Sequence, residues 1–283
     1  MRVMLTGARG QLGSDVYKEL LKSGILENEI YAPTHEELDI IDSKKVLNNV
    51  LAFDPDVIIH CAAYVKVDDA EKNKEECLAT NFIGTKNLAT VAKYLGSKFV
   101  YISTDYVFDG SKKGEYEVDD ETCPINYYGY TKLQGENIVK DLDKSFIFRI
   151  SWVFGENGKN FIKTMLRLSE TKNEITVVGD QIGSPTYTLD AAKTIVEAIS
   201  TSNYGVYHLT NEGFMSWADI AKKTFEVAGK DVKVIPIKTI EYKTLAARPL
   251  NSKLSKASLD AAGFKRLPDA EDAIKRYVKQ IIR

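Results

Sequence analysis

The stretch Thr6-Gly7-Ala8-Arg9-Gly10-Gln11-Leu12-Gly13 follows a short apolar run at residues 3–5 and leads into a periodic apolar segment. In such a loop, Gly7 permits a tight turn, Gly10 lets the backbone approach a pyrophosphate, and Gly13 allows a helix to pack closely on a strand. The N–H groups at the start of that helix are ready donors to phosphate oxygens. This context predicts a dinucleotide-binding loop, with an ordinary glycine-rich turn as the alternative.

Outward from this loop, short apolar runs alternate with longer amphipathic segments through the first half of the chain. We expect strands at residues 3–5, 30–32, 57–59, 99–103 and 145–154, and helices at residues 12–21, 46–51, 88–95 and 127–142. Such alternation predicts βαβ units and a parallel sheet whose strands are buried on both faces. The expected fold is therefore α/β, a Rossmann-type doubly wound parallel sheet.

Beyond residue 150 the alternation becomes less regular. Strands are expected at 175–178 and 206–209, and helices at 188–199, 217–228, 256–262 and 269–282. We predict a dinucleotide-binding domain of residues 1–150, to which 188–212 return, and a smaller, mostly C-terminal substrate-binding region of residues 151–187 and 213–283. Because no Pro/Gly/Ser-rich linker separates the two, a ligand cleft between them is expected.

Composition excludes several classes of protein. Lys+Arg 38 against Asp+Glu 40 gives a net charge of -2, which predicts no recruitment of nucleic acid or of an anionic membrane. The cysteines Cys61, Cys77 and Cys123 have no C-x-x-C spacing, which favours a reducing compartment over a disulfide framework. The first residues do not resemble a signal peptide, and no apolar run approaches the ~18 residues of a membrane span. A cytoplasmic location is expected.

The adenosine end of the predicted cofactor site is ambiguous. The acidic residue that binds an adenosine 2′-hydroxyl is expected about 20 residues beyond the glycine loop, where residues 33–35 read Pro-Thr-His. Arg9 is a candidate partner for a 2′-phosphate, but Glu36 and Glu37 lie nearby. The sequence therefore leaves the choice between NADPH and NADH open.

Two further segments are candidates for the cofactor site. Asp39 offers a carboxylate to an adenine amino group, the alternative being that Asp39 or Asp42 caps a helix starting at Ser43. The third strand ends in the small residues of His60-Cys61-Ala62-Ala63-Tyr64, against which a flat ring or ribose can lie, or which simply pack. We expect His60 to be a core side chain, because the other histidines show no metal-ligand spacing with it.

Three tyrosines, Tyr127, Tyr128 and Tyr130, stand where a helix is expected to begin. Only Tyr128 is at i, i+4 from Lys132, which places phenol and ammonium on one helical face. A cation at this spacing is expected to bring the phenol pKa from about 10 towards about 7, where an acid is most effective. Thr104 adds a hydroxyl at the end of the preceding strand. Together they predict a catalytic acid, with a surface Tyr-Lys pair as the alternative.

These motifs resemble the extended short-chain dehydrogenases/reductases, and within them the reductases that act on dTDP-4-dehydrorhamnose. The resemblance covers nearly the whole chain. It rests on TGARGQLG at 6–13, STDYVFDG at 103–110, YGYTKLQGE at 128–136, FRISWVFGENGKNFIKTML at 148–166, GDQIGSPT at 179–186 and RPLNSKL at 248–254.

The resemblance implies an enzyme of deoxysugar-nucleotide synthesis. Such an enzyme reduces the C4 ketone of dTDP-4-dehydro-L-rhamnose with NADPH or NADH and yields dTDP-L-rhamnose. The implied partner is a dTDP-sugar, with no nucleic acid or membrane, and the chain is expected to be a monomer or homodimer. Some relatives dimerise through magnesium, but the sequence shows no distinctive acidic cluster for that role, so no metal is predicted.

The resemblance also implies individual roles. Tyr128 is the implied proton donor, Lys132 binds the nicotinamide ribose and lowers the tyrosine pKa, and Thr104 binds the sugar oxygen. The implied cofactor-binding residues are Gly7, Gly10, Gln11, Leu12, Gly13, Asp39, Ile40, Ala62, Ala63, Tyr64, Val65, Tyr128 and Lys132, although the family often has a hydroxyl residue in place of Val65. The implied substrate-binding residues are Thr104, Asp105, Trp152, Arg248 and Asn251. For Trp152, packing between the domains is the alternative.

Two other functions remain open at this point. One is a nucleotide-sugar epimerase or 4,6-dehydratase, which also uses Tyr-x-x-x-Lys. In the related dehydratases the strand end reads Thr-Asp-Glu, whereas Tyr106 stands here in the place of the glutamate. The other is a catalytically silent, NADP-binding regulatory subunit, which has no need of the acid at Tyr128.

Overall fold

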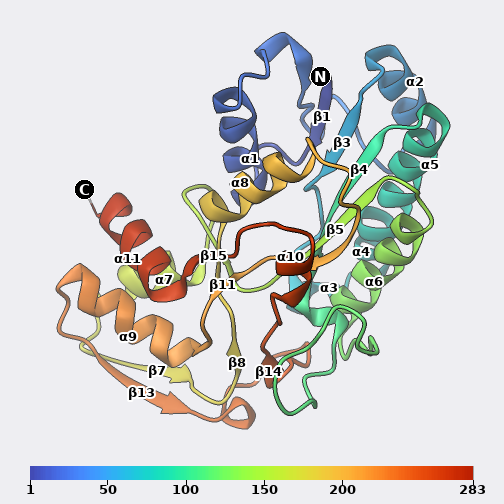
Figure 1. Ribbon diagram of the computed structural model, residues 1–283. Helices are drawn as coiled ribbons and strands as arrows, with labels where there is room; N and C mark the ends of the chain where they lie inside the picture. Colours follow the sequence, from blue (N-terminus) through green and yellow to red (C-terminus); the bar gives the residue numbers. More distant parts are fainter. Residues whose placement is uncertain (283) are drawn as a thin grey trace.

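A six-stranded parallel sheet forms the centre of the molecule, in the order β10-β5-β4-β3-β1-β2 (Figure 1). The structure is a computed structural model and describes residues 1–282. The strands are β1 (Val3–Thr6), β2 (Ile30–Tyr31), β3 (Val57–His60), β4 (Lys98–Thr104), β5 (Ser145–Ile150) and β10 (Gly205–His208). The predicted parallel sheet is confirmed.

Helices cover both faces of this sheet, because successive residues of each strand point to opposite sides. Val3 and Leu5 pack towards α1 (Gln11–Lys22) and α8 (Thr188–Ala198). Met4, between them, packs on the other face, which α2 (Ser43–Phe53), α5 (Thr85–Leu95) and α6 (Tyr127–Lys140) cover. Figure 1 shows α1 and α8 on one side and α2, α5 and α6 on the other. The predicted doubly wound arrangement is confirmed.

A second group of elements lies beside the carboxyl end of the sheet, at the lower left of Figure 1. It contains the parallel pair β7 (Glu174–Val178) and β13 (Lys233–Ile237), with α7 (Phe161–Leu168), α9 (Trp217–Ala228) and α11 (Ala270–Ile281). Two apolar clusters, separate from those of the central sheet, hold it together. The residue boundaries of two domains stay a prediction.

The remaining elements are short and lie in the connections between those already described. They are η1 (Glu27–Glu29), α3 (Val67–Ala70), α4 (Lys74–Leu78), η2 (Ala79–Gly84), η3 (Asp105–Val107), β6 (Val153–Phe154), β8 (Ile182–Gly183), β9 (Thr186–Tyr187), β11 (Asn211–Glu212), β12 (Met215–Ser216), η4 (Thr239–Glu241), β14 (Asn251–Ser252), α10 (Ala257–Ala261) and β15 (Leu267–Asp269). The single strand expected at 145–154 is two strands, β5 and β6, because Trp152 adopts a left-handed backbone with φ +50°.

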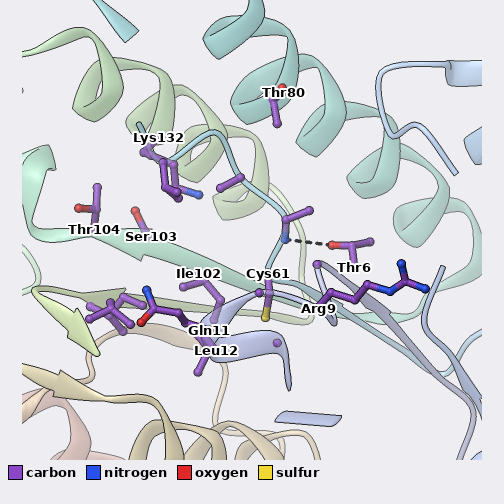
Figure 2. A pocket seen from close by; sticks show the side chains of 18 of the residues that line it. Thr6, Arg9, Gln11, Leu12, Cys61, Thr80, Ile102, Ser103, Thr104 and Lys132 are labelled. Carbon is purple, nitrogen blue, oxygen red and sulfur yellow. Dashed lines mark hydrogen bonds between the residues drawn. The ribbon is translucent and has the colours of Figure 1, made fainter. Parts of the chain in front are cut away.

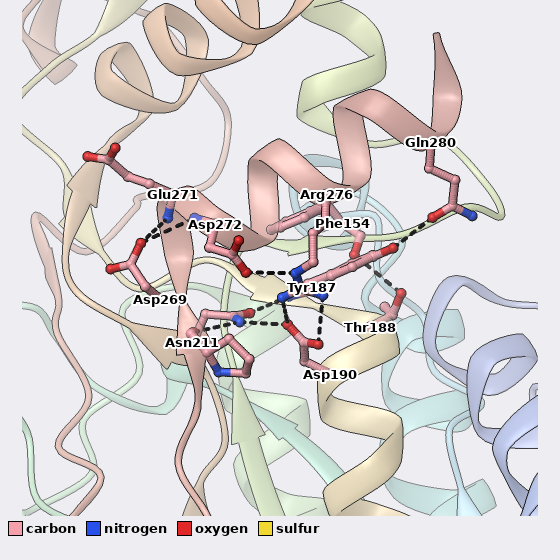
Figure 3. Close-up of polar contacts among 11 residues, drawn as sticks. Phe154, Tyr187, Thr188, Asp190, Asn211, Asp269, Glu271, Asp272, Arg276 and Gln280 are labelled. Carbon is pink, nitrogen blue, oxygen red and sulfur yellow. Dashed lines mark hydrogen bonds and ion pairs between the residues drawn. The ribbon is translucent and has the colours of Figure 1, made fainter. Parts of the chain in front are cut away.

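The last helix, α11, is tied to the central part of the chain by a charged cluster (Figure 3). Arg276 donates to the buried carboxylate of Asp190 on α8 at 3.0 and 2.6 Å, and to Asp272 on its own helix at 2.7 Å. Tyr187 donates to Gln280 at 2.9 Å. These contacts fix α11 against β9 and α8. Within residues 1–282, no helix is both long and apolar enough to cross a membrane.

Candidate active site

A cavity of about 740 Å³ opens at the carboxyl ends of β1, β3 and β4 (Figure 2). Its lining begins at the glycine loop and includes Lys132, Thr104 and, from the second group of elements, Trp217. In Figure 2, Arg9 lies towards one end, and Ser103, Thr104 and Lys132 lie towards the other. The carboxyl edge of a parallel sheet is where such folds bind ligands.

The glycine loop joins β1 to α1, as predicted, and two of its glycines are required by close approach. Gly7 has φ +70°, and a Cβ there would lie 2.7 Å from the Ala62 nitrogen. A Cβ on Gly13 would lie 2.1 Å from the Gly7 carbonyl oxygen. Helix α1 has Gly10 as its N-cap without a side-chain hydrogen bond, so its first N–H groups are left for a ligand. The loop therefore has the geometry of an anion cradle.

Gln11 and Leu12, at the start of α1, both line the cavity. The Gln11 side-chain oxygen Oε1 accepts from Asn160 Nδ2 at 3.2 Å, and Asn160 Nδ2 also donates to Tyr277 Oη at 2.8 Å. Residues at the start of α7 and on α11 thus hold one wall of the predicted cofactor site. Sequence reasoning missed Asn160 and Tyr277, because no local motif links positions so far apart.

The end of the cavity that is predicted to hold the adenosine contains the residues expected there. Arg9, His35 and Glu36 line it, as do Asp39 and Ile40. The structure also separates the two alternatives for Asp39, which are a contact with adenine and the capping of α2.

It is Asp42 that caps α2, accepting from the backbone N–H groups of Lys44 and Lys45 at 3.1 Å. Asp39 accepts instead from the backbone of Ile41 at 3.0 Å and faces the cavity. The contact between Asp39 and the adenine amino group therefore stays a prediction.

The segment after β3 is held by a residue that sequence reasoning did not single out. Asn81, in the wide helical turn η2, accepts from Tyr64 N at 2.8 Å and donates to Tyr64 O at 3.1 Å. Ala62, Ala63 and Val65 line the cavity, whereas Tyr64 is not part of the lining. No local motif marks Asn81, because its contacts with Tyr64 arise from packing between segments 17 residues apart.

His60 is a core side chain, as expected. It lies between the hydroxyls of Thr6 and Thr85 at 2.7 and 3.1 Å, and burial lowers its pKa to about 3. The ring is therefore neutral over the physiological range.

Tyr128 is brought to the cavity by the first turn of α6. Asn126 caps this helix by accepting from Gly129 N at 2.8 Å, and a Cβ on Gly129 would lie 2.1 Å from the Tyr106 carbonyl oxygen. The turn therefore packs directly against the segment that follows Thr104. Tyr128, Lys132 and Thr104 all line the cavity, so the structure brings the three predicted catalytic residues together.

The electrostatics differ from the expectation for this pair. Burial, with the nearby charge of Asp105, raises the Tyr128 pKa, and burial lowers the pKa of Lys132 to about 7. The Lys132 ammonium lies 4.0 Å from the centroid of the Tyr101 ring. The expectation that Lys132 brings the Tyr128 pKa down is therefore wrong for the protein by itself, because desolvation is the largest cause of both shifts.

Asp105 presents a buried acceptor beside these residues. Its Oδ1 accepts from the Thr104 hydroxyl at 3.1 Å, and its Oδ2 has no hydrogen-bond partner within the described part of the chain. Burial raises the pKa of this carboxyl to about 6. Because Asp105 lines the cavity, an incoming hydroxyl is a suitable partner for the free oxygen.

Trp152 both lines the cavity and packs against a neighbour. Its ring stacks on Trp217 with centroids 4.0 Å apart and planes at 17°. The packing role of Trp152 is therefore observed, and its contact with substrate stays a prediction that its place in the cavity wall permits.

Arg248 and Asn251 are placed elsewhere. Arg248 forms an ion pair with Asp68 of α3 at 2.7 Å, and Asn251 donates to the carbonyls of Lys112 and Gly114 at 2.6 and 2.8 Å. Neither residue belongs to the cavity lining. The structure shows both tying down the chain near the mouth, and their contact with substrate stays a prediction.

A Rossmann sheet, a glycine cradle and a Tyr-x-x-x-Lys pair beside a strand-end Thr are the features of nicotinamide-dependent oxidoreductases. Residues 1–283 match the family described as RmlD substrate binding domain. A dTDP-4-dehydrorhamnose reductase of Aggregatibacter actinomycetemcomitans is 41% identical over 274 residues, covering 92% of each chain. The chain belongs to this RmlD family, within the extended short-chain dehydrogenases/reductases.

Solved structures agree. The crystal structure of a dTDP-4-dehydrorhamnose reductase from Clostridium acetobutylicum is 39% identical, covers 100% of both chains and superimposes with a TM-score of 0.96. The enzyme of the same name from Bacillus anthracis, in complex with NADP, is 43% identical, with 99% coverage of both chains and a TM-score of 0.93. The fold is thus shared along the whole length of these chains.

Proposed function

We propose that the protein reduces the C4 ketone of dTDP-4-dehydro-L-rhamnose to dTDP-L-rhamnose, with NADPH or NADH as the hydride source. One observation carries this proposal. Thr104, Tyr128 and Lys132 meet in the same cavity as a glycine cradle, so an acid and a hydride donor can act on one ligand. The names of the relatives above supply the sugar and its nucleotide.

The residues present fit a nicotinamide dinucleotide. A side chain at Gly7 or Gly13 would strike backbone atoms, and the uncapped start of α1 offers N–H groups to a pyrophosphate. Gln11 and Leu12 would lie beside it, Asp39 and Ile40 beside the adenine, and Ala62 and Ala63 along the ribose side. When bound, the reduced nicotinamide supplies a hydride to C4 of the sugar.

Side chains of the protein supply the proton that the reduction requires. Tyr128 donates its phenolic proton to the C4 oxygen, which gains negative charge as the carbonyl is reduced. The Thr104 oxygen accepts from the N–H of Tyr106 at 3.2 Å, and its hydroxyl, which donates to Asp105 in the free protein, would turn to donate to the same sugar oxygen. Lys132, in its protonated form, stabilises the phenolate left behind.

Tyr106 favours the reductase over a dehydratase. Burial and the charge of Asp105 raise the pKa of this phenol, so at neutral pH it is not a base for removing a sugar C–H proton. Its ring lies edge-on to that of Tyr128, with centroids 6.0 Å apart. The carboxylate that elimination requires at this position is replaced by an aromatic wall.

The test is to follow nicotinamide absorbance with dTDP-4-dehydrorhamnose and each reduced cofactor in turn. We expect one reduced cofactor to be consumed per sugar. A regulatory subunit would bind cofactor and leave the absorbance unchanged. A second experiment tests the dehydratase alternative by incubating the protein with dTDP-glucose and catalytic NAD and analysing the product by mass. A product that has lost one water would contradict the proposal.

We also infer a cytoplasmic location, supported by the three free cysteines and by the nucleotide-sugar chemistry. A division at residues 1–150 with 188–212, against 151–187 with 213–283, is our proposal for the domains. The separate apolar cluster around α9 and α11 supports it, whereas Leu259, Phe264 and Leu267 pack in the cluster of the central sheet. A monomer or homodimer is proposed for the assembly.

A further inference from the structure

We propose that Glu136 is a positioning residue that keeps the Lys132 ammonium protonated, and that Arg149 and Ser103 hold its carboxylate in the orientation this requires. The proposal deepens the proposed function, on which the role of Lys132 in reduction rests. It assigns a purpose to a fully buried ion pair that neither binds a ligand nor lines the cavity.

Helix α6 places these groups in one line. Tyr128, Lys132 and Glu136 follow each other at i, i+4 spacing, so they occupy one helical face, with Tyr128 at the cavity and Glu136 in the interior. The face packs against β4, where Tyr101 Oη donates to the Lys132 carbonyl at 3.1 Å. Glu136 therefore follows Lys132 by one helical turn on the face that carries Tyr128.

The Glu136 carboxylate is held at both oxygens. Its Oε1 accepts from Ser103 Oγ at 2.5 Å and from Arg149 Nε at 2.9 Å, and its Oε2 accepts from Arg149 Nη2 at 2.9 Å. The two side chains are 0% and 1% exposed. Because Ser103 directly precedes Thr104 in β4, the cluster also ties α6 to the strand that carries the second catalytic hydroxyl.

The Glu136 carboxylate is held in its ionised form. Arg149 and Ser103 oppose the effect of burial, and the Glu136 pKa lies below its usual value. Arg149 itself also donates to the Val118 carbonyl at 3.0 Å and lies 3.4 Å from His208 Nε2. Lys140, one turn further along α6, lies 3.6 Å from Glu136. Glu136 is therefore ionised throughout the neutral range.

Other titratable groups around Lys132 are neutral at that pH. Burial lowers the pKa of His60 to about 3 and raises that of Cys61 to about 12; it also raises the pKa values of Cys77, Tyr101 and Tyr128. Within the described chain, Glu136 is the ionised carboxylate that favours the charged form of Lys132. When Glu136 is removed, nothing opposes the effect of burial, which favours the neutral amine of Lys132.

A purely structural clamp is the competing explanation. Well-packed apolar residues would hold α6 to β5 at least as well as a buried ion pair. A clamp also predicts no particular effect on the ionisation of Lys132. The titration of that one amine therefore separates the two explanations.

The experiment follows the Lys132 amine by NMR in the full chain labelled with 13C at lysine Cε. The signal is assigned by its loss in Lys132→Met. For Glu136→Gln we expect the titration midpoint to fall by about one pH unit or more. For Arg149→Met, which removes the cation that opposes the effect of burial on Glu136, the midpoint should also fall, because a protonated Glu136 no longer favours the ammonium. Glu136→Asp, which retains the charge, should stay near the wild-type midpoint.

The control is Glu226→Gln, the same chemical change at an exposed position of α9. It should leave the midpoint unchanged. If Glu136→Gln does not fold, because Arg149 is left buried without a counter-charge, the double variant Glu136→Gln with Arg149→Met removes both charges. It should still lower the midpoint, since the nearer charge is lost. An unchanged midpoint in the folded Glu136 variant overturns the proposal.

The pH profile of kcat/KM links this to catalysis. Loss of the carboxylate should move the alkaline limb to lower pH while activity on the acid side is kept; a general drop at every pH would instead indicate structural damage. If the wild-type protein reduces no dTDP-sugar, the proposed function fails, yet the NMR midpoints still decide the role of Glu136.

Discussion

Gly13 lies so close to Gly7 that a Cβ atom added to Gly13 would stand 2.1 Å from the Gly7 carbonyl oxygen. This contact sets the distance between α1 and the loop after β1, and hence the shape of the cradle. Gly13→Ala is therefore expected to lower the free energy of unfolding by roughly 1 to 3 kcal/mol and to weaken cofactor binding. Urea unfolding and fluorescence titration with NADPH measure the two effects.

Gly10→Ala is the matched comparison. Its Cβ would lie 3.2 Å from the Gly7 oxygen, and Gly10 has φ -76°, which alanine readily adopts. Stability should change little while NADPH affinity falls, because the methyl group enters the space for the pyrophosphate. Equal losses of stability in both variants would contradict this account of the loop.

Tyr128→Phe removes the phenolic proton and keeps the ring. We expect kcat to fall by ~10²- to 10⁴-fold with cofactor affinity little changed. Tyr130→Phe on the same helix, where the side chain is exposed, is the control and should retain activity. Near wild-type turnover by Tyr128→Phe would assign the proton to another donor.

Trp152→Ala tests the observed packing role of this residue and its predicted contact with substrate. Loss of the stack on Trp217 should reduce stability by less than the ~3 to 5 kcal/mol of a fully buried aromatic, because the ring is half-buried. At the same time KM for the sugar nucleotide should rise. Trp152→Phe, which keeps an aromatic face, should restore much of both. An unaltered KM would leave only the packing role.

Asp105→Asn should stabilise the protein at neutral pH. Burial raises the pKa of Asp105 from 3.8 to about 6, so the folded state binds the extra proton between these values. Wild-type stability therefore falls as pH rises from about 4 to about 6, by roughly 3 kcal/mol for this group alone. The variant should gain stability at about pH 8 and not at about pH 4, as measured by urea unfolding, with weaker substrate binding.

An equal gain at both pH values would show that the ionised carboxylate is not the source. The substrate measurement is independent, since it depends on the unpartnered Oδ2 rather than on titration.

The sequence predicted the sheet and the meeting of Thr104, Tyr128 and Lys132, because periodicity and helical spacing are local properties that the fold preserves. The pKa of Tyr128 was not predictable in this way. A spacing of four residues reports that two groups share a face, but not how far each is removed from water, and here burial dominates.

The residues that hold the site from a distance were also missed. Asn81 supports Tyr64, and Asn160 connects Gln11 to Tyr277 through contacts between segments far apart in the chain. The ion pair of Arg248 with Asp68 was missed in the same way, while the substrate contact that the motif suggested for Arg248 stays a prediction. Motifs identify residue types, whereas tertiary packing decides which of them meet.

The position of β10 beside β5 limits how the chain can be divided. β10 is contributed by residues 205–208, yet it covers the edge of β5, which carries the fully buried Phe146 and Phe148. A fragment ending at residue 150 would expose that strand with its backbone N–H and C=O groups unpaired. Such a fragment would be prone to self-association through this edge. Residues 1–150 are therefore not expected to behave as an independent domain.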